Sequence, residues 1–597
     1  MRWRNSLPAA LLVAASAVAL WPAVAQRAPE SILPPGFGQP DAPPAPTPPT
    51  ERPSRPSNDS VPDLRLNIPG STPAPAAQTD VIGDLIADSS NNMTAVAAAP
   101  VDLPPQARRS LDQVGLETVD DSGFGVDTYG ATDGRFLGLM MQRMNAPLAS
   151  RWMSIVLRRT LVAQSTIPQG IGGADWVAER AWLLLRMGEA DAARALVARV
   201  DAANFTPKLY AVAMQVALAT GDPASLCSIA NAAASVSDEP SWPLAQAMCA
   251  GLSGESGSAS ALVDRVRDTG TARGIDVLLA EKVVGAATNT RRSVSIQWDG
   301  VDRLTSWRFG LATATGVAVP PKLYGTVGPQ VQAWAARAPL LPAAARAPFA
   351  ERAAAMGVFS SQALTDFFGA LRDATDPAER SGSVGEQLRA AYSGDVSARL
   401  GAMRGLWDAK DTDLYARQIL TARAAATLAP GSGATGDDLD RVIGSMMSAG
   451  LDIQAARWTP ERGSLAWALL AVGAPRALEG LDDSAVNAID GGEEDRRAKF
   501  MLAALAGLGR ISAEDASRLA ESYTVPLGRE NNWTRALDRA AAARQPGTVV
   551  LIAAAGMQTR EWRYVPPEAL YRIVAAFRRV GLEPEARMIA AEALSRS

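Results

Sequence analysis

Residues 176–189 read Trp-Val-Ala-Glu-Arg-Ala-Trp-Leu-Leu-Leu-Arg-Met-Gly-Glu, and an Ala-rich apolar stretch follows up to Val200. The apolar side chains recur at helical spacing until the chain reaches Gly188. Glycine can take the left-handed conformation that ends a helix, and an acid such as Glu189 suits the first turn of the next helix. This stretch therefore predicts two helices joined at a glycine corner.

The same corner recurs at Gly221 and Gly254, and the spacing is constant because 221 − 188 = 33 and 254 − 221 = 33. Large residues fill matching places twelve before, five before and eight after each glycine: Trp176, Leu209 and Trp242; Leu183, Val216 and Cys249; and Leu196, Ile229 and Leu262. A period of this length is typical of helical-hairpin repeats. Coincidence among Ala-rich helices is the alternative, because glycine commonly caps helices.

Hairpins without a fixed period continue toward the end of the sequence. Gly450 and Gly473 interrupt apolar helical stretches, and Gly581 separates the final pair of helices. Pro584 then stands in the first turn of the last helix, where proline is tolerated. The expected fold class is therefore all-α, an α-solenoid of helical hairpins.

The stretch 291–321 departs from this pattern. Val294, Ile296 and Trp298 alternate with polar residues as in a strand, and several Gly and Pro follow. We interpret it as an irregular joint between a helical-repeat domain at residues 106–290 and a second hairpin region at residues 322–597.

Composition limits the chemistry. The 597 residues are 47% hydrophobic but only 6% aromatic, which suits closely packed helices rich in Ala, Leu and Val. The net charge is −4 and no basic block occurs, so we expect no nucleic-acid partner. The sequence contains no histidine, which excludes Ser-His-Asp and Cys-His catalysis and His-ligated metals. We expect no enzymatic activity, no cofactor and no metal, although chemistry by carboxylates, Lys or Tyr stays open.

The first residues predict export. Arg2 and Arg4 precede an apolar run over residues 7–20, and Ala23-Val-Ala25 forms a cleavage site, so residues 1–25 are a predicted signal peptide and the mature chain begins at Gln26. The alternative is an uncleaved anchor, but the run is shorter than the roughly 20 residues that span a bilayer. We expect no transmembrane segment in the mature chain, and a soluble protein in the periplasm or beyond.

Residues 26–105 form a predicted Pro-rich arm. Proline pairs at 34–35, 43–44 and 48–49 stand among Gly, Ser, Thr and Asp, with little to bury. Proline fixes φ and removes amide donors, so this arm should be extended or disordered. A semi-rigid spacer is one interpretation, and a docking motif for a partner at the apolar residues 81–86 is the other.

The two cysteines predict a disulfide. Cys227 is expected early in the second helix of the middle repeat, and Cys249 late in the following helix. Both lie at the same distance from a turn near Asp238, because 238 − 227 = 249 − 238 = 11, so an antiparallel hairpin sets them opposite each other. Export to an oxidising compartment would allow this disulfide to form. Two buried free thiols are the alternative.

Two motifs that carry chemistry in other proteins lack their context here. Residues 431–436 read Gly-Ser-Gly-Ala-Thr-Gly, but a helical stretch precedes them instead of a strand, and Asp437 stands where a phosphate-binding Lys would be needed. Glu521-Ser522 resembles the catalytic Glu-Ser of soluble lytic transglycosylases, with the Glu as general acid. The Gly-Leu-Met-Gln type of segment that follows in that family is missing. For the glycine-rich motif, a flexible helix–helix loop is the competing interpretation.

Acidic clusters and tryptophans are the remaining candidates for cation-binding and sugar-binding sites. The acids at 493–495 and at Asp437, Asp438 and Asp440 lack the spacing of a calcium loop and suit solvated turns. Six tryptophans in helical segments are expected in the core rather than on sugar-binding surfaces: Trp176, Trp182, Trp242, Trp334, Trp458 and Trp467.

Two resemblances follow from these features. The order of signal, Pro-rich segment with Ile32-Leu-Pro-Pro-Gly-Phe-Gly38, and Ala-rich hairpins resembles uncharacterised exported proteins of alphaproteobacteria. The hairpins at about residues 173–268 resemble tetratricopeptide-like repeats, which implies protein–protein binding. We therefore expect a non-enzymatic periplasmic scaffold or adaptor that binds another envelope protein. A cell-wall protein that binds or cleaves glycan, with Glu521 as its acid, is the alternative. The oligomeric state stays open.

Overall fold

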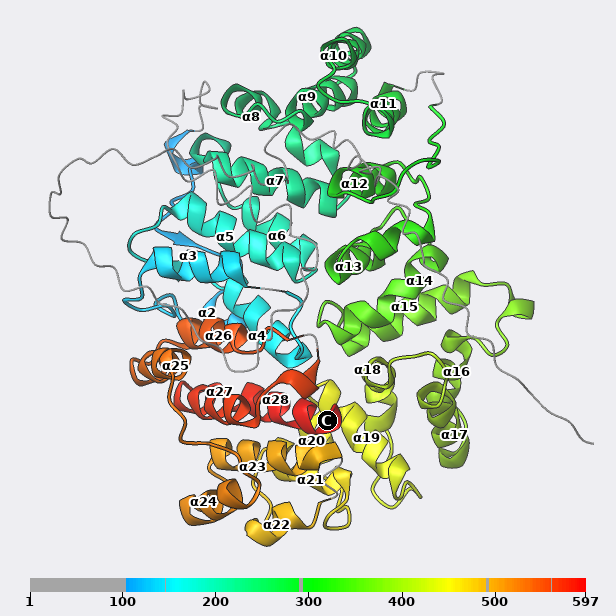
Figure 1. The fold of residues 1–597 in the computed structure, drawn as a ribbon. Helices are drawn as coiled ribbons and strands as arrows, with labels where there is room; N and C mark the ends of the chain where they lie inside the picture. The colour runs from blue at the N-terminus through cyan, green and yellow to red at the C-terminus, as the bar shows by residue number, and fades with distance from the viewer. Residues whose placement is uncertain (1–103, 145, 289–293, 490–492, 560) are drawn as a thin grey trace, which may run out of the picture.

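The computed structural model describes residues 104–597 apart from positions 145, 289–293, 490–492 and 560. The predicted signal peptide, the cleavage site at Ala25 and Gln26, and nearly all of the predicted arm lie outside these residues. The described chain is a succession of helical hairpins, which confirms the predicted all-α helical-repeat fold (Figure 1).

The first part precedes the repeats and contains short elements and two longer helices. They are η1 (Pro105–Ala107), β1 (Gln113–Val114), α2 (Val119–Ser122), α3 (Gly134–Arg143), α4 (Arg151–Val162) and β2 (Ser165–Thr166). The two strands pair antiparallel, with Val114 opposite Ser165. The side chain of Asp133 accepts the N–H of Phe136, and that of Ser150 accepts the N–H of Met153, so both longer helices begin at a polar cap.

Three hairpins follow and stack on one another (Figure 1). Their elements are α5 (Gly173–Arg186) with α6 (Ala190–Val197); α7 (Pro207–Ala219) with η3 (Pro223–Leu226) and α8 (Ala230–Val236); and α9 (Ser241–Leu252) with α10 (Ser256–Thr269), while η2 (Ala202–Asn204) links the first two hairpins. The matched residues Trp176, Leu209 and Trp242 are at most 1% exposed. The repeated positions therefore build the continuous core of the stack.

After the third hairpin the chain turns back along the stack. This return leg consists of α11 (Ile275–Thr288), α12 (Ser306–Ala314), η4 (Pro321–Thr326), α13 (Pro329–Arg337), α14 (Ala343–Ala355) and α15 (Ser361–Ala374). It packs on the repeats: α11 lies against α9, and α12 lies against α7. Gly310 of α12 approaches so closely that a Cβ there would stand 2.5 Å from the carbonyl oxygen of Leu218.

The prediction of an irregular joint at residues 291–321 is wrong for its second half, which forms α12. Thr305 caps this helix by accepting the N–H of Arg308, and Phe309 and Leu311 bury its inner face. The alternating residues 294–298 pair with no strand in the described part of the chain. Residues from both sides of the joint share one hydrophobic core, from Val114 to Leu594, so 291–321 does not divide the fold into two halves.

The last leg runs from the side of α15 back to the beginning of the described chain (Figure 1). Its elements are η5 (Pro377–Glu379), α16 (Val384–Ala391), α17 (Val396–Trp407), α18 (Leu414–Ala426), α19 (Asp437–Ser448), α20 (Asp452–Ala455), α21 (Leu465–Gly473), α22 (Asp483–Asn487), η6 (Glu493–Asp495), α23 (Arg496–Leu508), α24 (Ala513–Ser522), α25 (Asn532–Ala542), α26 (Pro546–Ala555), η7 (Trp562–Tyr564), α27 (Pro567–Arg579) and α28 (Glu583–Ser595). A second, smaller core lies within α13–α18 and includes Ala353, Leu364 and Ile419.

The stack closes on itself, because α26 and α28 pack against α4. The main-chain N–H of Gly547 donates to the carbonyl of Thr128 at 2.9 Å, and the hydroxyl of Ser150 donates to Glu592 Oε2 at 2.6 Å. The curved stack is thus a closed path of hairpins. Among the described helices, none has the length and apolar character needed to cross a bilayer.

Candidate functional site

The predicted glycine corners all have the left-handed backbone. Gly188, Gly221, Gly254 and Gly581 lie between consecutive helices with φ of +90°, +62°, +83° and +86°. A Cβ on Gly188 would lie 2.8 Å from Ala333 Cβ, and one on Gly221 would lie 3.0 Å from Thr313 Oγ1. A Cβ on Gly254 would meet no atom within 4 Å. The return leg therefore covers the first two corners and leaves the third corner open.

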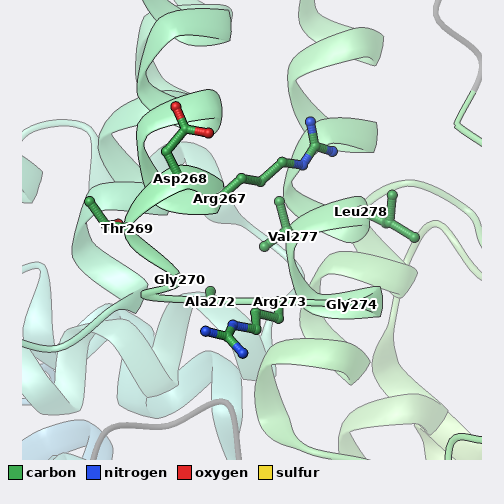
Figure 2. A pocket seen from close by; sticks show the side chains of 9 residues that line it. All are labelled: Arg267, Asp268, Thr269, Gly270, Ala272, Arg273, Gly274, Val277 and Leu278. Carbon is green, nitrogen blue, oxygen red and sulfur yellow. The ribbon is translucent and has the colours of Figure 1, made fainter.

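A hollow of about 460 Å³ lies around the turn that joins α10 to α11, at the opposite end of α10 from Gly254 (Figure 2). Its lining is Arg267, Asp268, Thr269, Gly270, Ala272, Arg273, Gly274, Val277 and Leu278. The lining combines two guanidinium groups with the half-buried Leu278. Such a mixture of charge and apolar surface suits the binding of a polypeptide more than the positioning of a reacting group.

The two arginines of the hollow differ in their partners. Arg267 forms ion pairs with Glu281 and, at 3.6 Å, with Asp264. Arg273 is exposed and forms no ion pair with any residue in the described ranges. Its guanidinium lies against Gly270, since a Cβ there would stand 2.6 Å from Nη2. Figure 2 shows Asp268 pointing away from Arg273, so Arg273 is the cation of this hollow that remains open to an incoming anion.

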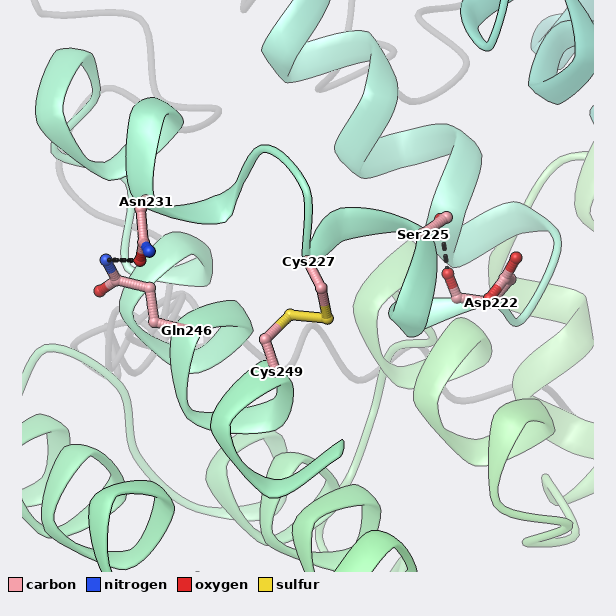
Figure 3. Close-up of a disulfide and its surroundings, with 6 residues drawn as sticks. All are labelled: Asp222, Ser225, Cys227, Asn231, Gln246 and Cys249. Carbon is pink, nitrogen blue, oxygen red and sulfur yellow. Dashed lines mark hydrogen bonds between the residues drawn. A yellow bond between two sulfur atoms is a disulfide. The ribbon is translucent and has the colours of Figure 1, made fainter. Parts of the chain in front are cut away.

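The predicted disulfide is confirmed, with Cys227 and Cys249 joined at a Cα–Cα distance of 5.2 Å (Figure 3). The placement of Cys227 inside a helix is wrong. It follows η3 and lies in the turn before α8 begins at Ala230. The turn near Asp238 does separate α8 from α9, so the expected antiparallel hairpin brings the two sulfurs together. The bond ties the second repeat to the third.

The glycine-rich motif at 431–436 connects α18 to α19, so a helix precedes it and the βαβ context of dinucleotide-binding loops is missing. Gly431, Gly433 and Gly436 all have positive φ, which explains the three glycines as loop residues.

The acidic candidates do not converge on one place. Asp438 pairs with Arg404, and Asp440 accepts the N–H of Ala466 at 2.7 Å. Glu521 is exposed on α24 and is not among the residues that line the hollow beside Arg273. Within the same residues, no three His, Cys, Asp or Glu side chains come together as metal ligands would. The six tryptophans are buried in the core, as expected.

The centre of the closed path holds a buried polar junction that the sequence patterns did not reveal. Arg151, at the start of α4, donates to three main-chain carbonyls: Nε to Ala354 at 2.8 Å, Nη1 to Ser448 at 2.9 Å, and Nη2 to Phe359 at 3.3 Å. Its own main-chain N–H donates to Glu592 Oε1 at 2.8 Å. The guanidinium thus satisfies carbonyls at the ends of α14 and α19 that have no partner inside their helices.

The same junction contains two further ionisable side chains. Arg596 pairs with Glu592 at 3.0 Å and lies 4.7 Å over the ring of Tyr415. Burial and the neighbouring Glu592 carboxylate hold the pKa of Tyr415 well above its usual range. Residues separated by hundreds of positions meet here, so local sequence patterns do not predict this junction. The one local indication is Ser150, a residue type that often caps helices.

Glu189, at the first corner, is a second buried ionisable group. Arg158 Nη1 lies 3.4 Å from Glu189 Oε1, which is longer than an ideal charge-assisted hydrogen bond. Burial raises the pKa of Glu189 from its ordinary 4.5 to about 7, and the nearby Arg158 and Arg337 oppose part of that rise. The corner between α5 and α6 therefore contains a carboxyl group that titrates near neutral pH.

Comparisons with known proteins add no family to this description. The chain matches no protein-family model, no curated protein and no solved structure.

Proposed function

We propose that this chain is a non-enzymatic scaffold of the periplasm that binds an acidic segment of another envelope protein. The carrying observation is the hollow between α10 and α11, at the turn where the return leg begins. Arg273 supplies a positive charge that forms no ion pair with the residues that the structure describes, and Leu278 supplies apolar surface beside it. The orphan main-chain N–H groups at the start of α11 carry partial positive charge on the same side.

The rest of the fold supports a role in which the hollow is presented to a partner protein. α10 is an outer helix of the stack, and only Ala259, Val263 and Val266 of this helix are buried. The disulfide ties the second repeat to the third, which contains α10. A disulfide also supports an oxidising compartment, in agreement with the predicted export.

Site-specific photocrosslinking in the cells that make the protein tests the proposal. A photoreactive residue at Leu278, in the hollow, should trap one specific envelope protein. The same residue at Glu521, on the remote α24, is the matched control and should trap nothing specific. Equal labelling from both positions, or no adduct from Leu278, would contradict the proposal.

In the alternative function, cleavage of cell-wall glycan, Glu521 acts as the general acid. If the protein cleaves peptidoglycan with this residue as its acid, purified protein clears a peptidoglycan suspension and Glu521→Gln stops the clearing. Nothing in the surroundings of Glu521 favours this chemistry, because the side chain stands on the exposed face of α24. We expect the suspension to stay turbid with both proteins.

A further inference from the structure

Residues 294–298 form an extended segment at the surface, between α11 and α12. In Figure 1 the chain runs down the outer side of the molecule here, from the end of α11 toward α12. Val294, Ile296 and Trp298 are half-buried, and the last two pack against the hydrophobic core. Ser295 and Gln297 are exposed. This alternation is what an extended chain gives when one of its faces is covered.

The main chain of this segment is open along one side. Lys282 Nζ, on α11, donates to the carbonyl of Val294 at 3.2 Å, so that carbonyl points toward α11. Successive residues of an extended chain direct their N–H and C=O groups to opposite sides, so Ser295 and Gln297 direct theirs away from α11. Neither residue forms a main-chain hydrogen bond with any part of the chain that the structure describes. The segment therefore has the character of an unpaired strand edge, which favours the addition of another strand.

We propose that residues 64–68 of the same chain pair with this edge as an added strand. They read Leu-Arg-Leu-Asn-Ile, an alternation of apolar and polar residues between Pro62 and Pro69. Such an alternation predicts a short strand with one apolar face, and the flanking prolines end its pairing at both sides. Residues 64–68 belong to the Pro-rich arm, so the arm then returns to the folded part.

The two segments match in register. An antiparallel alignment that sets Leu66 beside Ile296 also sets Leu64 beside Trp298 and Ile68 beside Val294. In that alignment the three apolar residues of the arm continue the covered face of the edge. The open groups of Ser295 and Gln297 then meet the main-chain groups of Asn67 and Arg65, and neither of these residues is a proline.

The arm is long enough to make this contact. Residues 69–104 can extend over at most about 3.3–3.6 Å per residue, or roughly 120 Å. A folded part of this size has a radius of gyration of roughly 23 Å. Residues 64–68 can therefore reach any face of the folded part, including the segment beside α11.

Amide hydrogen exchange on the full chain tests the pairing. We expect the N–H groups of Ser295 and Gln297 to exchange at least about tenfold more slowly than unpaired amides do, because each is held in a hydrogen bond. Asn67→Pro removes a main-chain donor from the added strand and should restore fast exchange at both positions. Asn58→Pro makes the same change elsewhere in the arm and should leave exchange slow.

Three results would overturn the proposal. The first is fast exchange at Ser295 and Gln297 in the unaltered protein, and the second is slow exchange that survives Asn67→Pro. The third is protection that disappears on dilution, which would assign the edge to a second copy of the chain. Both variants alter only the arm, so circular dichroism should show an unchanged helical content.

Discussion

Glu592 Oε1 accepts the main-chain N–H of Arg151 at 2.8 Å, across 441 positions of sequence. The other oxygen of this carboxylate accepts the hydroxyl of Ser150 at 2.6 Å and the N–H of Trp152 at 3.0 Å. A side chain near the end of the chain thus caps the helix that begins the closed path, and its negative charge lies at the positive end of α4. This contact joins the last helix of the stack to one of the first.

Removal of the Glu592 carboxylate should destabilise the whole fold. Glu592→Ala leaves the buried Arg151 and the half-buried Arg596 without their acid and uncaps α4, so we expect a loss of roughly 3–5 kcal/mol in unfolding free energy. Glu583→Gln changes an exposed acid on the same helix and should cost below about 1 kcal/mol. Urea unfolding followed by circular dichroism measures both. Equal effects of the two substitutions would show that the junction does not close the fold.

The glycine corners provide a matched pair of substitutions. Gly254→Ala imposes the left-handed backbone on a residue with a Cβ and should cost about 1–2 kcal/mol. Gly188→Ala imposes the same strain and also places a Cβ 2.8 Å from Ala333 Cβ, so it should cost a further 1–3 kcal/mol or so. Thermal unfolding of the two variants measures the difference. If Gly254→Ala is the more damaging change, the return leg does not cover the first corner.

Loss of the disulfide should weaken the end of the stack. Cys227 and Cys249 close a loop with a sequence separation of 22, and in the chain-entropy model such a bond contributes about 3 kcal/mol. The double variant Cys227→Ser, Cys249→Ser should lose this amount in urea unfolding. Reductant should lower the stability of the unaltered protein toward that of the double variant and leave the variant unchanged. A reductant effect on the variant would contradict this account.

Glu189 should make stability depend on pH. Its pKa is about 7 in the folded protein against an ordinary 4.5, so the folded state holds a proton that the unfolded state releases between these values. The resulting stabilisation is complete below pH 4.5 and is lost as pH rises through 7, with a total of about 3 kcal/mol. Glu189→Gln should remove this decline between pH 5 and pH 8, whereas Asp191→Asn, at an exposed neighbour, should keep it. An unchanged pH profile in Glu189→Gln would show that another group causes the decline.

Local sequence patterns were sufficient for the hairpins and the disulfide. The corners at Gly188, Gly221 and Gly254 depend on a glycine and on apolar residues within one helix length, and both are visible in a short window. The pairing of Cys227 with Cys249 followed from the symmetry of one antiparallel hairpin, even though the helix limits around Cys227 were displaced. Errors of this size arise because helix ends are set by caps and short 3₁₀ turns that apolar periodicity does not show.

Contacts between distant segments could not be predicted in this way. The closure through Arg151 and Glu592 requires the three-dimensional course of the whole chain, and neither residue differs locally from a solvated one. The helix α12 was missed because nearby Gly and Pro obscured its nine residues, although Thr305 is an ordinary helix cap. The hollow beside Arg273 depends on how α11 packs against α10 at the turn between them, and that is a property of packing rather than of the repeat itself.

The proposed binding role depends most directly on Arg273. Once the protein trapped from Leu278 is purified, its affinity for the full chain should fall at least about tenfold with Arg273→Glu, because the charge that meets its acidic segment is reversed. Arg265→Glu reverses an exposed charge on α10 outside the hollow and should change the affinity by less than about threefold. Equal affinities of the unaltered protein and Arg273→Glu, measured by titration calorimetry, would contradict the account.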